Sequence, residues 1–187
     1  MNRIAIGRGL HGAWLLARGE AAGAMLLPDD AAGARRSFWA MAIALPGFLC
    51  LRLIDWTGQR PAHPGHALVL DLLSYAVGWL GFAVLSHHLA RRLGRAALWP
   101  RFIAAWNWCN VVQYLVVVAA ALPGLAGAPA MVDQVAGLVA LGWALWLEWF
   151  AARLTLRLGG VAAAGLVVMD VAIGVMLAGV AGALGGG

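Results

Sequence analysis

The sequence predicts an all-α polytopic membrane protein, a bundle of five transmembrane helices, and two observations lead to this fold class. Of the 187 residues, 63% are apolar and only 11% are charged, whereas a soluble domain has about 45–50% apolar and about 25% charged residues. Such a chain has too little polar surface to cover a water-soluble globule, and it is too apolar to stay disordered in water. Five windows also each offer about 20 mainly apolar residues, the length that crosses the hydrocarbon core.

The five expected spans follow one another through short connections. They cover residues 37–54, 67–88, 102–122, 130–152 and 160–184. Pro123 is expected to end the third span, and residues 123–129 are rich in Pro and Gly, which favour turns. Because this connection is so short, we expect the third and fourth spans to be antiparallel neighbours.

The segment before the first span, residues 1–36, is predicted to be a cytoplasmic arm without a cleavable secretory signal. Two structures remain open for it: an amphipathic helix that lies in the membrane interface, or a loosely ordered arm. An apolar arc at helical spacing favours the helix, whereas several glycines weaken it. Asp29 or Asp30 is expected to cap a short helix that leads into the first span.

The arginines set the expected orientation, because positively charged flanks stay in the cytoplasm during insertion. Five arginines precede the first span, four lie between the second and third, and two follow the fourth. Only Arg52 and Arg60 fall on the opposite side. We therefore expect a cytoplasmic N-terminus and a periplasmic C-terminus. The use of Arg to the exclusion of Lys is typical of a GC-rich bacterial genome, so the expected location is the bacterial inner membrane.

A small set of polar residues lies inside the expected spans, where ionisable groups are costly and indicate function by default. Asp170 is the most central carboxyl group, roughly 15 Å from the nearer end of its span at 1.5 Å per residue. Glu148 is shallower. The third span supplies possible partners at similar depths, with Asn107 near the level of Glu148 and with Asn110 and Gln113 around the level of Asp170.

Two interpretations of this polar set remain open. Side chains of these types often hydrogen-bond across neighbouring helices, so the set could be a structural clasp. It could also be a proton or ion relay in which Asp170 is the titrating carboxylate.

Tryptophan and small residues complete the candidate features. Most of the ten Trp residues lie within a few turns of the expected span ends, which predicts an aromatic belt at the membrane interfaces. Gly174, Ala178 and Gly182 repeat every four residues, a spacing that lets another helix approach closely. This helix-packing stripe could serve the bundle itself, a homo-oligomer or a partner subunit.

No pattern of catalytic residues stands out in the sequence. We find no Ser/His/Asp order, no phosphate-binding Gly loop and no Cys-x-x-Cys pair, and the dispersed arginines do not indicate nucleic-acid binding. His63 and His66 supply two ligands at most, which is too few to predict a metal site. We therefore expect a protein that is not an enzyme, with no cofactor and no metal, whose surroundings are the lipid bilayer.

The chain resembles the Yip family of small five-span membrane proteins, in particular its uncharacterised bacterial branch. The resemblance lies in three segments, Gly12-Ala-Trp-Leu-Leu-Ala-Arg-Gly19, Arg101-Phe-Ile-Ala-Ala-Trp-Asn-Trp108 and Leu166-Val-Val-Met-Asp170. It implies an interaction protein. The Asp-Leu-Tyr-Gly-Pro type signature of the eukaryotic members does not occur before the first span, so the binding of small GTPases does not carry over.

Together these features predict a non-catalytic membrane organiser or interaction partner. The alternative is a small transporter or channel that uses Asp170 with Asn107, Asn110 and Gln113. Co-purification of a stoichiometric protein partner would favour the first hypothesis, and isolation of a lone homo-oligomer with a specific small molecule or lipid would favour the second.

Overall fold

The computed structural model describes residues 3–185, and within that range it contains helices and no strands. Five long helices form the membrane domain: α3 (Trp39–Gly58), α4 (Pro64–Arg92), α5 (Trp99–Leu125), α6 (Ala130–Leu156) and α7 (Gly160–Gly185). Four shorter elements accompany them: α1 (Arg3–Ala17), η1 (Ala21–Leu26), α2 (Ala31–Ser37) and η2 (Ala96–Leu98). All five long helices are long and apolar enough to cross a membrane, which confirms the predicted polytopic fold class.

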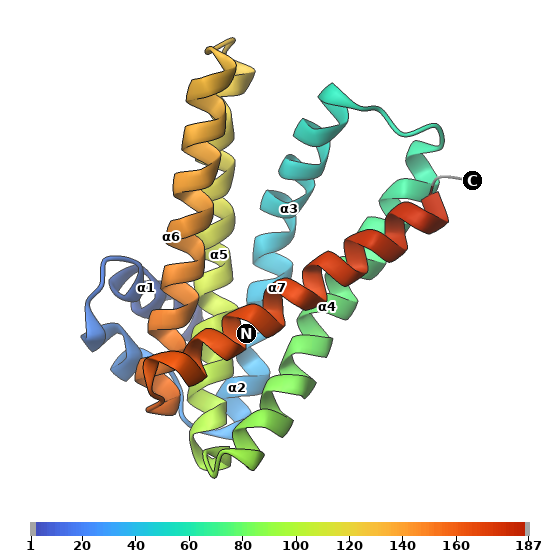
Figure 1. Ribbon diagram of the computed structural model, residues 1–187. Helices are drawn as coiled ribbons and strands as arrows, with labels where there is room; N and C mark the ends of the chain where they lie inside the picture. The colour runs from blue at the N-terminus through green and yellow to red at the C-terminus, as the bar shows by residue number, and fades with distance from the viewer. Residues whose placement is uncertain (1–2, 186–187) are drawn as a thin grey trace.

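The helices form two arms that diverge from a common base (Figure 1). α5 and α6 run side by side as one arm, α4 and α7 lean away together as the other, and α3 stands between them and packs against α5. The antiparallel pairing of the third and fourth spans is thus confirmed. α5 continues two residues beyond Pro123, which lies in its last turn and not at its end.

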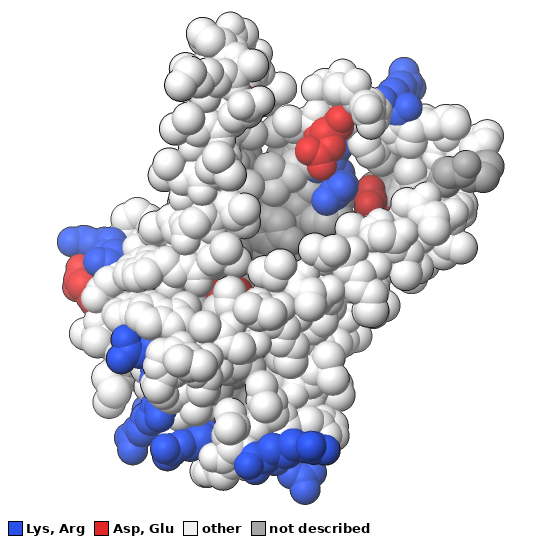
Figure 2. All heavy atoms as spheres, in the orientation of Figure 1, with Lys and Arg blue, Asp and Glu red and all other residues white. Residues whose placement is uncertain are grey.

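The two ends of the bundle differ in charge. The arginine-rich end comprises the segment before α3 and the α4–α5 and α6–α7 connections, and it carries Arg91, Arg92, Arg95 and Arg157 among others. The open end comprises the α3–α4 and α5–α6 connections and the last turns of α7. Figure 2 shows many of the basic side chains at the lower end of the view, with further charged side chains at the left edge, around the hollow and at the upper right.

Packing is concentrated at the arginine-rich end. Every residue of α5 from Phe102 to Cys109 is buried, whereas Leu115 and Leu122 further along the same helix are exposed. Phe82 of α4 and Leu166 of α7 are also fully buried near this end. The core therefore holds the arms together at the base and leaves them apart toward the open end.

The segment before α3 is helical and docks on the bundle. Gly9 of α1 is buried directly against the indole ring of Trp108 in α5, so closely that a Cβ atom at Gly9 would overlap the ring. Asp30 caps α2 by accepting a hydrogen bond from the Gly33 N–H. Asp30 is one of the two residues predicted to cap this helix, and the prediction is confirmed for it. Asp29 instead pairs with Arg101 of α5 at 2.8 Å. The glycine that was expected to weaken the helix is what allows its close contact with α5.

Candidate functional site

The space between the arms forms a cleft of about 600 Å³. This is within the range of roughly 300–1,000 Å³ that small-molecule sites occupy. Side chains of α3, α4, α5 and α7 line it, and the hollow between the arms is visible in Figure 2. The cleft lies within the membrane-spanning part of the chain, above the packed base.

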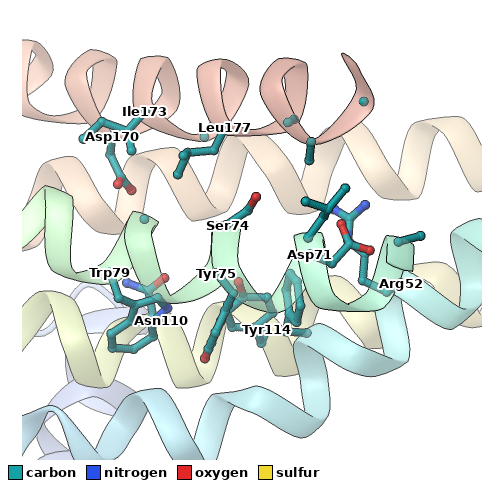
Figure 3. A pocket seen from close by; sticks show the side chains of 18 of the residues that line it. Arg52, Asp71, Ser74, Tyr75, Trp79, Asn110, Tyr114, Asp170, Ile173 and Leu177 are labelled. Carbon is teal, nitrogen blue, oxygen red and sulfur yellow. The ribbon is translucent and has the colours of Figure 1, made fainter. Parts of the chain in front are cut away.

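Figure 3 shows how the lining side chains are distributed along the cleft. Asp170 points from α7 into the cavity, with Asn110 of α5 and Trp79 of α4 across from it. Arg52 and Asp71 lie toward the other end of the cavity. The deep end therefore presents a carboxyl group, and the mouth presents one charge of each sign.

Aromatic rings form much of the remaining wall. Tyr75 contacts Phe48 at a centroid distance of 4.6 Å and Trp79 at 5.8 Å, and Tyr114 lies 6.2 Å from Tyr75. The hydroxyl group of Tyr75 donates to the Met41 carbonyl at 2.7 Å, which fixes the ring against α3. Trp106 adds a further ring, 5.1 Å from Trp79.

A second carboxyl group lies behind the deep end of the cleft. Glu148 of α6 is buried, with 6% of its surface exposed, and it interacts electrostatically with Asp170. The indole N–H of Trp106 lies near both carboxyl groups. Within residues 3–185, however, neither Trp106 Nε1 nor Glu148 Oε1 has a well-formed hydrogen bond. Three helices thus bring together two acids and an indole donor, with Glu148 buried and Asp170 at the wall of the cleft.

The three amides of the third span point in different directions. Asn107 is fully buried and donates to Ser37 Oγ at 2.7 Å, away from the cleft. Gln113 donates to the Ala144 carbonyl of α6 at 2.8 Å. Only Asn110 lines the cleft with Asp170, and its amide donates to the Trp106 carbonyl one turn earlier at 2.9 Å. Of the amides predicted to act together, the structure places one at the cleft and two in contacts between elements.

The hydrogen bond of Gln113 to α6 is therefore expected to stabilise the fold. Replacing Gln113 with leucine should lower the free energy of unfolding by roughly 0.6 kcal/mol and at most about 1.7 kcal/mol, the average and maximum for hydrogen bonds between membrane helices. Asn110→Leu is the matched control, because the Asn110 amide bonds within its own helix and joins no second one. Thermal unfolding in mild detergent measures both variants. Equal midpoints for the two would contradict a clasp at Gln113.

The small-residue stripe of α7 does not pack against another helix in the described part of the chain. Gly174, Ala178 and Gly182 all line the cleft, and no described atom lies within 4 Å of where a Cβ at Gly174 or Gly182 would stand. Packing of this stripe within the bundle, one of its three predicted uses, is therefore not seen. The reason is the lean of α7, which carries this face over the cavity.

Several tryptophans also depart from the predicted aromatic belt. Trp39 and Trp146 are exposed, as a belt requires. Trp79, Trp106 and Trp108 are each no more than 5% exposed and belong to the core. Distance from a span end predicts depth but not the side of the helix on which a ring lies.

The mouth of the cleft contains two charged residues that the sequence did not indicate as site residues. Its place near a span end predicts only that Asp71 faces water, and Arg52 serves above only to set the orientation, yet both line the cavity. Arg52 pairs with Asp55 at 3.3 Å and lies 5.6 Å from the Phe48 ring centroid. A possible signal was the shared depth of Arg52 and Asp71 on successive antiparallel spans.

Comparison of the sequence with protein-family models gives no match, and comparisons with curated proteins and with solved structures give none either. The resemblance to the Yip family stays a prediction.

Proposed function

We propose that this protein binds a small organic cation in the cleft and passes it across the membrane without catalysing a covalent reaction. The observation that carries this proposal is Asp170, a carboxyl group that faces a cavity of about 600 Å³ at the depth of the membrane. A charge at that depth is costly unless a partner balances it.

The chemistry of the wall favours a cation over other ligands. Aromatic faces attract positive charge, and quaternary ammonium groups are the ligands that such walls recognise best. Asp71 and Asp170 contribute two negative charges to the lining and Arg52 contributes one positive charge. Because Arg52 is already paired with Asp55, the cleft favours a ligand of positive charge and partly apolar surface.

The packing at the base supports passage by a change between two states. The Phe82 ring stacks on Trp106 at 4.4 Å and lies 6.1 Å from Phe102, which closes the cleft toward the arginine-rich end. A carrier must close one side of its binding site while the other is open. The arrangement fits a state that is open at one end only, and release at the other end would require these rings to separate.

Uptake of radiolabelled tetraethylammonium into proteoliposomes tests the proposal. This ion is a compact quaternary ammonium group that does not cross a lipid bilayer readily. We expect saturable uptake that depends on the protein. The variant Ala178→Leu, which places a larger side chain on the cleft wall, should take up the ion more slowly. The matched control is leucine at Ala172, a small residue of the same helix that does not line the cleft. Uptake no faster than in protein-free liposomes would overturn the proposal.

The orientation follows from the same arginine asymmetry. We propose that the chain lies in the bacterial inner membrane with the arginine-rich end in the cytoplasm and the C-terminus in the periplasm. Alkaline phosphatase fused after residue 187 should then be active, and the same enzyme fused within the α4–α5 connection should be inactive. The reverse pattern would contradict this orientation.

A second candidate is the role of membrane organiser or interaction partner, to which the resemblance to the Yip family points. The observation in its favour is the stripe Gly174, Ala178 and Gly182, which no described helix covers. A helix of a partner or of a second copy could approach α7 closely there. Stoichiometric co-purification of one membrane protein, lost in Gly174→Leu but retained in Gly142→Leu on α6, would favour this role over transport.

A further inference from the structure

A second cavity lies at the arginine-rich end, between α1, α2 and α5. Its volume is about 160 Å³, close to the roughly 150 Å³ of an engineered cavity that holds a benzene ring. Two arginines from different helices line it, Arg8 of α1 and Arg36 of α2. Ile6, Leu26 and Trp108 supply an apolar wall beside them.

The positive charge of this cavity is not balanced by nearby acids. No acidic side chain lines it. The acids of the same segment have other partners: Glu20 pairs with Arg18, Asp29 pairs with Arg101, and Asp30 caps α2. In the part of the chain that the structure describes, neither Arg8 nor Arg36 forms an ion pair with an acidic side chain. Two exposed arginines on different helices therefore line one small cavity, and neither is paired with an acid of the described segment.

We propose that this cavity binds the phosphate group of an anionic phospholipid. Guanidinium groups bind phosphate oxygens with paired, charge-assisted hydrogen bonds, and a five-atom phosphate group fits the volume. The apolar wall would contact the glycerol and ester part of the same lipid. Basic pockets between helices at the membrane surface are recognised sites for lipid headgroups.

The proposed lipid would also bridge the N-terminal segment to the bundle. Arg8 and Arg36 lie on separate helices, and Trp108 belongs to α5. A phosphate group held by both arginines would connect α1 to α2, and the apolar part of the same lipid would contact α5. The docking of α1 is thus expected to strengthen when anionic lipid is present. This inference is independent of the cation proposed for the cleft, and either can fail alone.

The experiment is native mass spectrometry of the full chain released from nanodiscs of phosphatidylcholine with phosphatidylglycerol. We expect the wild-type protein to retain one phosphatidylglycerol. The double variant Arg8→Gln with Arg36→Gln should bind it roughly 25-fold more weakly, because each arginine near a membrane surface contributes about a factor of five. The matched control is Arg91→Gln with Arg92→Gln, which removes the same charge from the same end but outside the cavity.

A further variant separates the cavity from its charge. Ala5 lines the cavity and is exposed, so Ala5→Phe would fill the space while both arginines remain. It should lose the lipid as the arginine pair does, and its folding is checked by size exclusion and circular dichroism. Equal lipid loss in the Arg91/Arg92 control, or retention in Ala5→Phe, would overturn the proposal. If the wild-type protein retains no lipid but binds inorganic phosphate at millimolar concentration, the proposal is also overturned, and the ligand is a free anion.

Discussion

Replacing Asp170 with asparagine is expected to weaken the binding of tetraethylammonium by roughly thirtyfold or more. Asparagine keeps the shape of the side chain and removes its charge. Loss of one partner from a buried charge pair costs about 2–5 kcal/mol, and each 1.4 kcal/mol is about a factor of ten in affinity. Equilibrium binding of the radiolabelled ion to purified protein in nanodiscs measures the change directly.

Two further carboxyl groups provide controls for that result. Asp133 lies in α6 and does not line the cleft, so Asp133→Asn should bind tetraethylammonium as the wild type does. Asp71 lies at the mouth, where water screens its charge, and Asp71→Asn should have a smaller effect than Asp170→Asn. Equal affinities for Asp170→Asn and the wild type would show that the carboxyl group is not the anchor for the cation.

Alanine at Gly9 is expected to undock the N-terminal helix. A Cβ atom there would overlap the indole of Trp108, which is buried, so the ring or the helix would have to shift. Overpacking of this kind typically costs about 1–3 kcal/mol. Trypsin should therefore cleave after Arg18 and Arg36 faster in Gly9→Ala than in the wild type, because Arg18 directly follows α1 and Arg36 lines the cavity that α1 helps to form.

Gly7→Ala is the matched control on the same helix. Gly7 is exposed and no described atom lies within 4 Å of a Cβ at this position. Alanine favours a helix over glycine by about 0.8–1.0 kcal/mol, so this variant should be cleaved no faster than the wild type. If both variants behave alike, the contact between Gly9 and Trp108 does not hold the helix in place.

The spans were predictable because their length and composition are set by the bilayer. The hairpin between α5 and α6 followed from a short connection rich in Pro and Gly, and the cap at Asp30 followed from helix-start preferences. The divergence of the two arms was not predictable in this way. It depends on which buried side chains meet, such as Phe82 with Trp106, and a hydropathy pattern does not specify those contacts.

The depth of the candidate site residues in the membrane was predictable from the sequence, but the direction in which each side chain points around its helix was not. Asp170 and Asn110 were expected at one level, and both line the cleft. Asn107 was expected to act together with Asn110, but the three residues between these positions span about 300° of a helix and leave an offset of about 60°. That offset is enough to turn Asn107 to Ser37 of α2. The aromatic wall was not predictable, because the positions of Tyr75 and Trp79 along a span do not specify the side of the helix on which their rings lie.

The most direct test of the account is to find where a cation binds. A quaternary ammonium ion that carries a diazirine can be photo-crosslinked to the protein in nanodiscs, and the labelled residues can be mapped by mass spectrometry. We expect labels on side chains that line the cleft, such as Tyr75 and Leu177, and their loss when tetraethylammonium is present in excess. Labels confined to lipid-facing residues such as Leu138 and Val168, or labels that tetraethylammonium does not displace, would contradict the account.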